Sequence, residues 1–363
     1  MAFTNNKTAL SICKLGCGPK GVTREDLLAK LINSGVANFD AVSDQPVFAF
    51  AGWRFFGAPV DEANVFLGGH MCFQFLKAVR RIPGALLKDE CAKAEAAFIQ
   101  NNPGLDGIGY TTVPSKERKR IKQETKERLL KTMPVSIKGT QIAIDVTSGL
   151  VYVATASQAE LDNIACFFYK ITDIQMIRVQ NSQVFENIEQ LKIGNNKTTG
   201  QATYRDFLTW FWFVAEERGA KLTFSGMTIE GLLEGPVTLV SEDPNDTKGA
   251  AVATLRKGGF PQVSSEAKSA LLIGKKLKKA KVTFTIGQLV WSGTFDADTF
   301  AFSGLSLPEP EEMGVESIFM GNIANLELLH AFLGAYITWF SKDMESDEIR
   351  QFIATWAEER QAL

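Results

Sequence analysis

The chain has 363 residues, of which 45% are hydrophobic, and a formal net charge of −2. This apolar content is ample for a folded core and excludes a disordered chain, and the near-neutral balance excludes a uniformly basic nucleic-acid coat. The charge is nevertheless segregated, because residues 268–281 contain six Lys and no acid, whereas residues 309–363 contain eleven acids and three basic residues.

The sparse Cys and His residues predict no metal site. Five Cys are scattered along the chain, and the CxxxC pair of Cys13 and Cys17 has no second ligand pair or nearby His. His70 and His330 lie in predicted apolar elements, which favours structural roles over catalytic ones. With no run of 18 apolar residues and no signal-peptide pattern of a cationic N-terminal region followed by a long apolar one, we expect a reduced, cytoplasmic protein without membrane association.

Apolar periodicity predicts alternating strands and helices in the first third of the chain. Thr23 is the expected N-cap of the first helix, and the Phe-rich stretch at 39–56 is typical of a sheet core. The expected elements are a strand at 7–19, a helix at 23–33, a strand at 69–79, a helix at 83–100 and a loop at 101–113.

A basic segment then dominates the middle of the chain. From Pro114 to Lys138 there are nine Lys or Arg against three Glu, in a helix expected to begin after the candidate N-cap Ser115. At 100° per residue this helix would carry a line of cations formed by Arg118, Lys122 and Lys126. The adjacent face, formed by Ile121, Thr125 and Leu129, would pack against the rest of the protein. Two interpretations stay open: a solvated helix with Glu–Lys pairs, or a face that contacts phosphates.

After this helix the pattern predicts a β-hairpin and a second helix. Residues 141–146 and 150–155 are rich in Ile and Val and flank a Thr-Ser-Gly turn, and residues 158–171 form an amphipathic helix.

The second half of the chain predicts an aromatic helix, a sheet and two closing helices. The helix at 204–217 is apolar nearly all round and is expected to be buried. The further elements are strands within 223–263, a helix at 265–278, a Lys-flanked strand from 279, strands at 288–295 and 299–307, a linker at 308–312, and helices at 315–340 and 346–360, the last capped by Ser346.

Recognisable catalytic motifs are absent from the sequence. It contains no Walker A loop, no GxSxG and no HExxH. A metal-dependent nuclease would need converging carboxylates, for which Asp145 and Asp162 are candidates only by elimination. We therefore expect no enzyme activity and no cofactor, with a metal-dependent DNA exonuclease or other DNA-processing enzyme as the alternative.

Several segments, in order, resemble the bacterial recombination-associated protein RdgC family, in its longer branch with an FLTWLWF-like stretch. The resemblance runs from about residue 45 to the C-terminus. It is carried by GW at 52–53, RRIP at 80–83, the basic helix running into QIAIDVTSGLVYVATAS, FLTWFWF at 207–213 and LIGKK at 272–276.

This resemblance implies a fold, a partner and a place in the cell. It implies an α+β subunit, elongated and multi-lobed, with antiparallel sheets and flanking helices, that pairs into a ring-shaped homodimer around duplex DNA. Such a protein would be nucleoid-associated and would restrain a RecA-type recombinase without breaking a bond. The loop at 131–138 could lie at a tip where two subunits meet through Met133, Val135 and Ile137, although it lacks the aromatic residue found in shorter family members.

The sequence therefore predicts a sequence-nonspecific DNA-binding protein. Four parts are expected: an N-terminal α+β lobe (1–112), a tip-like lobe (113–200), an aromatic-helix and sheet lobe (201–307) and a C-terminal helical segment (308–363). An unspecialised cytosolic scaffold is the remaining possibility. The expected phosphate contacts are Arg118, Lys119, Lys122, Lys126, Lys131, Lys275, Lys276, Lys278, Lys279 and Lys281.

Overall fold

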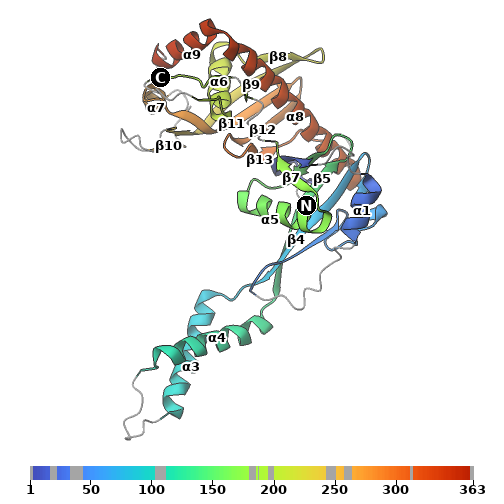
Figure 1. The fold of residues 1–363 in the computed structure, drawn as a ribbon, viewed down its shortest axis with the longest axis vertical. Coiled ribbons are helices and arrows are strands. Elements are labelled where there is room, and N and C mark those ends of the chain that lie inside the picture. Colours follow the sequence, from blue (N-terminus) through green and yellow to red (C-terminus); the bar gives the residue numbers. More distant parts are fainter. Residues whose placement is uncertain are drawn as a thin grey trace. The chain divides into compact units, whose positions relative to one another are not determined.

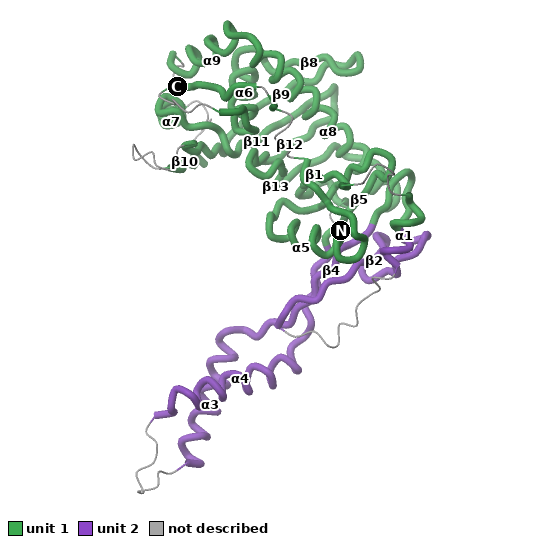
Figure 2. Tube along the Cα trace, viewed as in Figure 1, with its two compact units in different colours: residues 1–27, 65–72, 140–363 green, residues 28–64, 73–139 purple. Residues whose placement is uncertain are grey.

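A computed structural model describes residues 3–16, 23–32, 44–102, 112–179, 185–186, 188–194, 200–242, 251–256, 264–310 and 314–359. The chain divides into two compact units (Figure 2). Unit 1 comprises residues 1–27, 65–72 and 140–363, and unit 2 comprises residues 28–64 and 73–139. These boundaries differ from the four parts expected from the sequence. Strands β4 (His70–Arg80) and β5 (Val135–Asp145) contribute residues to both units, so no polar linker marks the division.

Unit 1 is built on an antiparallel sheet. Its strand order is β10-β9-β11-β12-β13-β1-β6-β5, with β7 beside β1 and β8 beside β9. The remaining bounds are β1 (Lys7–Gly16), β6 (Leu150–Val153), β7 (Gln175–Arg178), β8 (Lys221–Phe224), β9 (Met227–Val240), β10 (Val252–Leu255), β11 (Lys276–Ile286), β12 (Leu289–Asp296) and β13 (Ala301–Ser306). The short β3 (Phe66–Leu67) pairs with the start of β4.

Helices pack on one face of the β9–β13 part of this sheet (Figure 1). Phe211 of α6 (Tyr204–Glu217) meets Phe284 of β11 edge to face, and Phe332 of α8 (Val315–Glu345) meets Trp291 of β12. Burial of these large rings supplies much of the hydrophobic stabilisation of unit 1. The other helices of this unit are α5 (Gln158–Thr172), α7 (Ser265–Leu272) and α9 (Asp347–Glu359).

Unit 2 combines a strand pair with a helical hairpin. Strand β2 (Val47–Gly52) pairs with β4 in an antiparallel register that sets Phe50 opposite Phe75. Helices α3 (Gly84–Asn101) and α4 (Ser115–Thr132) pack against each other, and no residue of α3 is fully buried. The short helices α1 (Arg24–Ile32) and α2 (Glu62–Val65) lie at the boundaries of the two units along the chain.

The predicted α+β class, antiparallel sheet and flanking helices are confirmed. Local signals also succeeded at the expected caps: the Thr23 hydroxyl accepts the Asp26 N–H at 3.1 Å, and Ser346 caps α9. Three predicted bounds were wrong: β5 begins at Val135 within the expected loop, α7 ends at Leu272 before Lys276 opens β11, and α8 continues to Glu345, past the expected end at 340. Ring closure and dimerisation stay predictions.

Helix α8 has the length and apolar composition that crossing a membrane would require. In unit 1, however, it carries a buried stripe from Phe319 to Met344, and its Tyr336 hydroxyl donates to the Ala220 carbonyl at 2.6 Å. This is the arrangement of a core helix in a globular unit.

Candidate nucleic-acid interface

The packing face of α4 lies where its periodicity predicts. Ile121, Thr125 and Leu129 are buried, so the neighbouring positions are held at the surface. Ser115 does not cap this helix: Pro114 occupies the N-cap position, and its carbonyl accepts the Arg118 N–H at 2.9 Å. The expected cap was wrong because the preceding proline already has the extended backbone that precedes a helix.

Beside the packing face, α4 presents a cationic edge, defined here as Arg118, Lys119, Lys122 and Lys126. Arg118 pairs with Glu95 of α3 at 3.3 Å, and the Lys126 ammonium lies against Asp44, whose pKa is lowered chiefly by that hydrogen bond. Lys119 and Lys122 are exposed and have no acidic partner among the described residues. Lys131, also predicted as a phosphate contact, is exposed in the last turn of α4.

Two neighbouring hollows follow this cationic edge within unit 2. One, of about 510 Å³, lies between α3 and α4, and the other, of about 410 Å³, lies between α4, α3 and β4. Leu87 lines both. Their charged lining is seven cations against two acids: Lys77, Arg80, Arg81, Lys88, Arg118, Lys122 and Lys126 against Asp44 and Glu95. We call this region the cationic groove.

Four residues of the cationic groove were not predicted as phosphate contacts. Lys77, Arg80 and Arg81 come from β4 and the segment after it, and Lys88 comes from α3. The adjacent Arg80-Arg81 pair was visible in the sequence as part of the family resemblance, but only tertiary packing places it beside α4. Arg80 has a structural task as well, since its guanidinium donates to carbonyls at the end of α4, including Met133 at 2.7 Å.

Charge separates between the two units. Residues 28–64 and 73–139 contain sixteen Lys and Arg and eleven Asp and Glu, an excess of five positive charges, while the whole chain has a net charge of −2. The remaining residues therefore have a net charge of −7. A polyanion is attracted to unit 2 and repelled by the average charge of unit 1.

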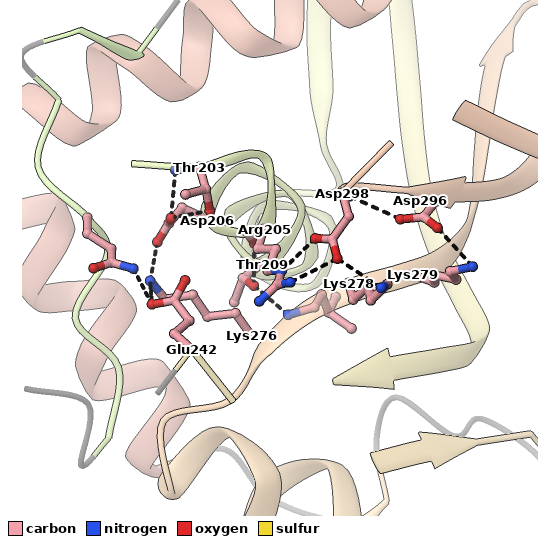
Figure 3. Close-up of polar contacts among 12 residues, drawn as sticks. Thr203, Arg205, Asp206, Thr209, Glu242, Lys276, Lys278, Lys279, Asp296 and Asp298 are labelled. Carbon is pink, nitrogen blue, oxygen red and sulfur yellow. Dashed lines mark hydrogen bonds and ion pairs between the residues drawn. The ribbon is translucent and has the colours of Figure 1, made fainter. Parts of the chain in front are cut away.

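The lysines at and before the start of β11 are not available to phosphates as the sequence predicted. Figure 3 shows the carboxylates that surround Lys276. Lys276 is completely buried, with its ammonium 2.6 Å from an Asp206 oxygen and 2.8 Å from a Glu242 oxygen. Lys275 is only 5% exposed. A phosphate group cannot reach either side chain while unit 1 is folded, so we remove both from the predicted contacts.

The three remaining lysines, Lys278, Lys279 and Lys281 of β11, are partly exposed and ion-paired. Asp298 lies 2.9 Å from Lys278, Asp296 lies 2.8 Å from Lys279, and Glu234 lies 2.7 Å from Lys281. Each carboxylate neutralises the charge that a phosphate would otherwise meet. Clustering of Lys along the sequence overstated the positive charge here, because the acids come from other strands and loops.

Asp298 joins α6 to the β11–β12 sheet. Its carboxylate accepts two hydrogen bonds from Arg205, at 2.6 and 2.8 Å, and also contacts Lys278. Burial alone would raise its pKa, but the hydrogen bonds from Arg205 and Lys278 outweigh burial and lower the pKa below the usual range. The ionised form is therefore the one that unit 1 stabilises.

Asp298→Asn is expected to destabilise the protein at neutral pH. The pKa of Asp298 is lower in the folded protein than the value of about 3.9 in the unfolded chain, so the ionised carboxylate stabilises the folded state at any pH above the unfolded-state pKa. This stabilisation is lost as the pH falls through the folded-state pKa. The gap in unfolding free energy between wild type and variant should shrink below about pH 4. Urea unfolding from pH 7 to pH 3 measures it, and a gap that does not change with pH would contradict the assignment.

The expected phosphate contacts divide between the two units. The α4 cations belong to unit 2 and the β11 lysines to unit 1. The expectation that both sets line a single concave surface stays a prediction.

The predicted subunit contact at 131–138 has a different local structure. Met133 follows the end of α4, and Val135 and Ile137 are in β5. Ile137 packs against a buried cluster of unit 2, formed by Ala49, Ala51 and Leu76. Ile137, like Met133 and Val135, is nevertheless only half-buried, so the contact between subunits through these three residues stays a prediction.

The carboxylates considered for catalysis have structural partners. Asp145 accepts the Thr147 N–H at 2.9 Å in the hairpin turn, and Asp162 pairs with Arg178. His70 contacts Glu327 at 2.9 Å, and burial lowers the pKa of His330. Within the described part of the chain, no three His, Cys, Asp or Glu side chains are placed to hold a metal ion. Cys17 lies outside the described residues, and Cys13 is a buried thiol.

Neither a protein-family model nor a curated protein matches this chain. The assignment of a function therefore depends on the chemistry of the sites described above.

Proposed function

We propose that this protein binds nucleic acid through the phosphate backbone, without sequence specificity and without catalysis, with duplex DNA as the expected ligand. The observation that supports the proposal is the cationic edge of α4, where Lys119 and Lys122 are exposed beside the cationic groove and have no acidic partner among the described residues. Phosphate contacts fix a nucleic acid in place but do not read its sequence. A surface of Lys and Arg alone fits that mode of binding.

Release of counterions from the DNA drives this association. Each phosphate that a Lys or Arg neutralises releases condensed cations into solution. This release contributes a favourable free energy of binding, which becomes smaller as the salt concentration rises. The acidic balance of the residues outside unit 2 would keep the polyanion on the basic unit. Binding by this route covers DNA and breaks no bond, so it denies other proteins access to the duplex.

The resemblance to the RdgC family extends this proposal to a cellular role. In that role, a homodimer at the nucleoid would cover or encircle duplex DNA and restrain a RecA-type recombinase. The groove adds support only for the DNA-binding part of the role. The dimer and the recombinase are tested separately, by sedimentation and by strand-exchange assays.

The salt dependence of duplex binding is the direct test. Fluorescence anisotropy with a labelled 20-base-pair duplex should give a log K that falls linearly with log salt, with a slope of about −0.9 per neutralised phosphate. Engagement of Lys119 and Lys122, the two cations of the α4 edge that have no acidic partner among the described residues, predicts a slope of about −1.8 or steeper. Absence of binding at low salt would overturn the proposal, and cleavage of the duplex on addition of Mg²⁺ or Mn²⁺ would favour the nuclease alternative instead.

A further inference from the structure

Two adjacent phenylalanines of unit 2 lie in solvent, directly after β2. The side chains of Phe55 and Phe56 are 56% and 52% exposed, although the neighbouring Trp53 is 1% exposed. Isolated exposed apolar residues are common, but two consecutive Phe rings in one turn form a concentrated apolar surface. We call residues 53–57 the aromatic turn.

The aromatic turn is rigidly held. Gln74 of β4, 3% exposed, donates from its side-chain amide to the carbonyl of Gly52, which precedes the turn, at 3.0 Å, and to the carbonyls of Trp53 and Phe55 within it, both at 3.3 Å. A buried amide satisfied in this way fixes the path of the backbone. The two rings are therefore presented by a built turn.

Backbone bonds close the aromatic turn on the other side. The Gly52 N–H donates to the Ala58 carbonyl at 2.8 Å, and the Ala58 N–H donates to the Phe55 carbonyl at 3.1 Å. Gly57 has φ +77, and a Cβ at this position would meet no atom within 4 Å, so the chain reverses there beside open space. A rigid turn loses little conformational entropy when it binds a partner.

The charge around the aromatic turn favours nucleobases as the partner. Arg54 is exposed between Trp53 and Phe55, with its guanidinium carbon 5.8 Å from the Trp53 ring, and unit 2 as a whole has five excess positive charges. Single-stranded nucleic acids bind where cations hold the backbone and aromatic rings stack on successive bases. An apolar protein partner would use the rings but would gain nothing from the cations.

We infer that Phe55 and Phe56 form a stacking platform for unpaired bases, which makes single-stranded nucleic acid a second ligand class of unit 2. This inference rests on the proposed function, because the cations of unit 2 supply the phosphate contacts. The rings add affinity that depends on bases and that a phosphate backbone alone cannot provide.

The test compares two single strands of equal charge. The full-length protein and its Phe55→Ala/Phe56→Ala variant are titrated with labelled 20-nucleotide oligothymidylate and with a 20-nucleotide abasic strand. Removal of both stacking rings should weaken binding of the variant to oligothymidylate by about 30-fold, and leave binding to the abasic strand unchanged. Leu289→Ala/Val290→Ala, which removes another adjacent pair of exposed apolar side chains, in unit 1, should change neither affinity.

Several results would overturn the platform. If the Phe55→Ala/Phe56→Ala variant binds both strands more weakly by the same factor, or if its unfolding midpoint is lower, the rings contribute to folding. If its binding to oligothymidylate is unchanged, the rings have no role in binding. A change from dimer to monomer in sedimentation would assign them to contact between copies of this chain. Equal affinity of wild type for the two strands, or binding to neither strand while duplex binding persists, refutes the platform alone. Absence of duplex binding as well refutes the proposed function.

Discussion

Replacing Lys119 and Lys122 by Glu should weaken duplex DNA binding on the order of 100-fold at low salt. Both ammonium groups are exposed on the α4 edge without an acidic partner among the described residues, so they are available to phosphates. The variant replaces two attractive charges by two repulsive ones. The slope of log K against log salt should also become shallower by about 1.8, or about 0.9 for each phosphate that is no longer neutralised.

Anisotropy titrations between about 50 and 200 mM salt measure both effects, and a matched variant controls for net charge. Lys14→Glu/Lys170→Glu changes the charge by the same amount at two exposed lysines of unit 1 that have no acidic partner among the described residues. This control should retain affinity to within about threefold, since the altered charges are outside unit 2. An equal loss in both variants would mean that overall charge, and not the α4 edge, governs binding.

Lys276→Met should destabilise unit 1 by about 3–5 kcal/mol. The variant removes the cation from a buried cluster and leaves the Asp206 and Glu242 carboxylates facing each other without compensation. Asp206 also accepts the Thr203 and Leu191 N–H groups, at 2.8 and 2.9 Å, so it cannot turn away without breaking the start of α6. Urea unfolding followed by circular dichroism measures the loss.

A neighbouring lysine provides the comparison for Lys276. Lys278→Met removes a half-buried member of the Arg205–Asp298 ion pairs and should cost less, about 1 kcal/mol or under, because solvent and Arg205 still stabilise Asp298. Lys276→Met/Asp206→Asn should lose less stability than the two single changes added together, since the charges are coupled. Equal costs for Lys276→Met and Lys278→Met would contradict the buried cluster.

These two predictions concern lysines that look alike in sequence. Both α4 and the start of β11 are Lys-rich, and both were expected to contact phosphates. Helical periodicity was sufficient for α4, because the apolar positions Ile121, Thr125 and Leu129 identify the buried face and leave the cations at the surface. No such local rule identifies the partners of Lys276, which are 70 and 34 residues away along the chain.

The same distinction holds for the fold. Apolar patterns, turn residues and caps determined the α+β class and most of the longer elements, since these signals act over a few residues, but they did not indicate the short α2, β3 and β7. Tertiary structure alone decided the division into two units, the packing of Ile137 against the cluster of Ala49, Ala51 and Leu76, the cations that β4 and α3 add to the groove, and the acids that neutralise β11. The physical reason is range: hydrogen-bond geometry and periodicity are local, whereas charge neutralisation and burial depend on groups that only folding brings together.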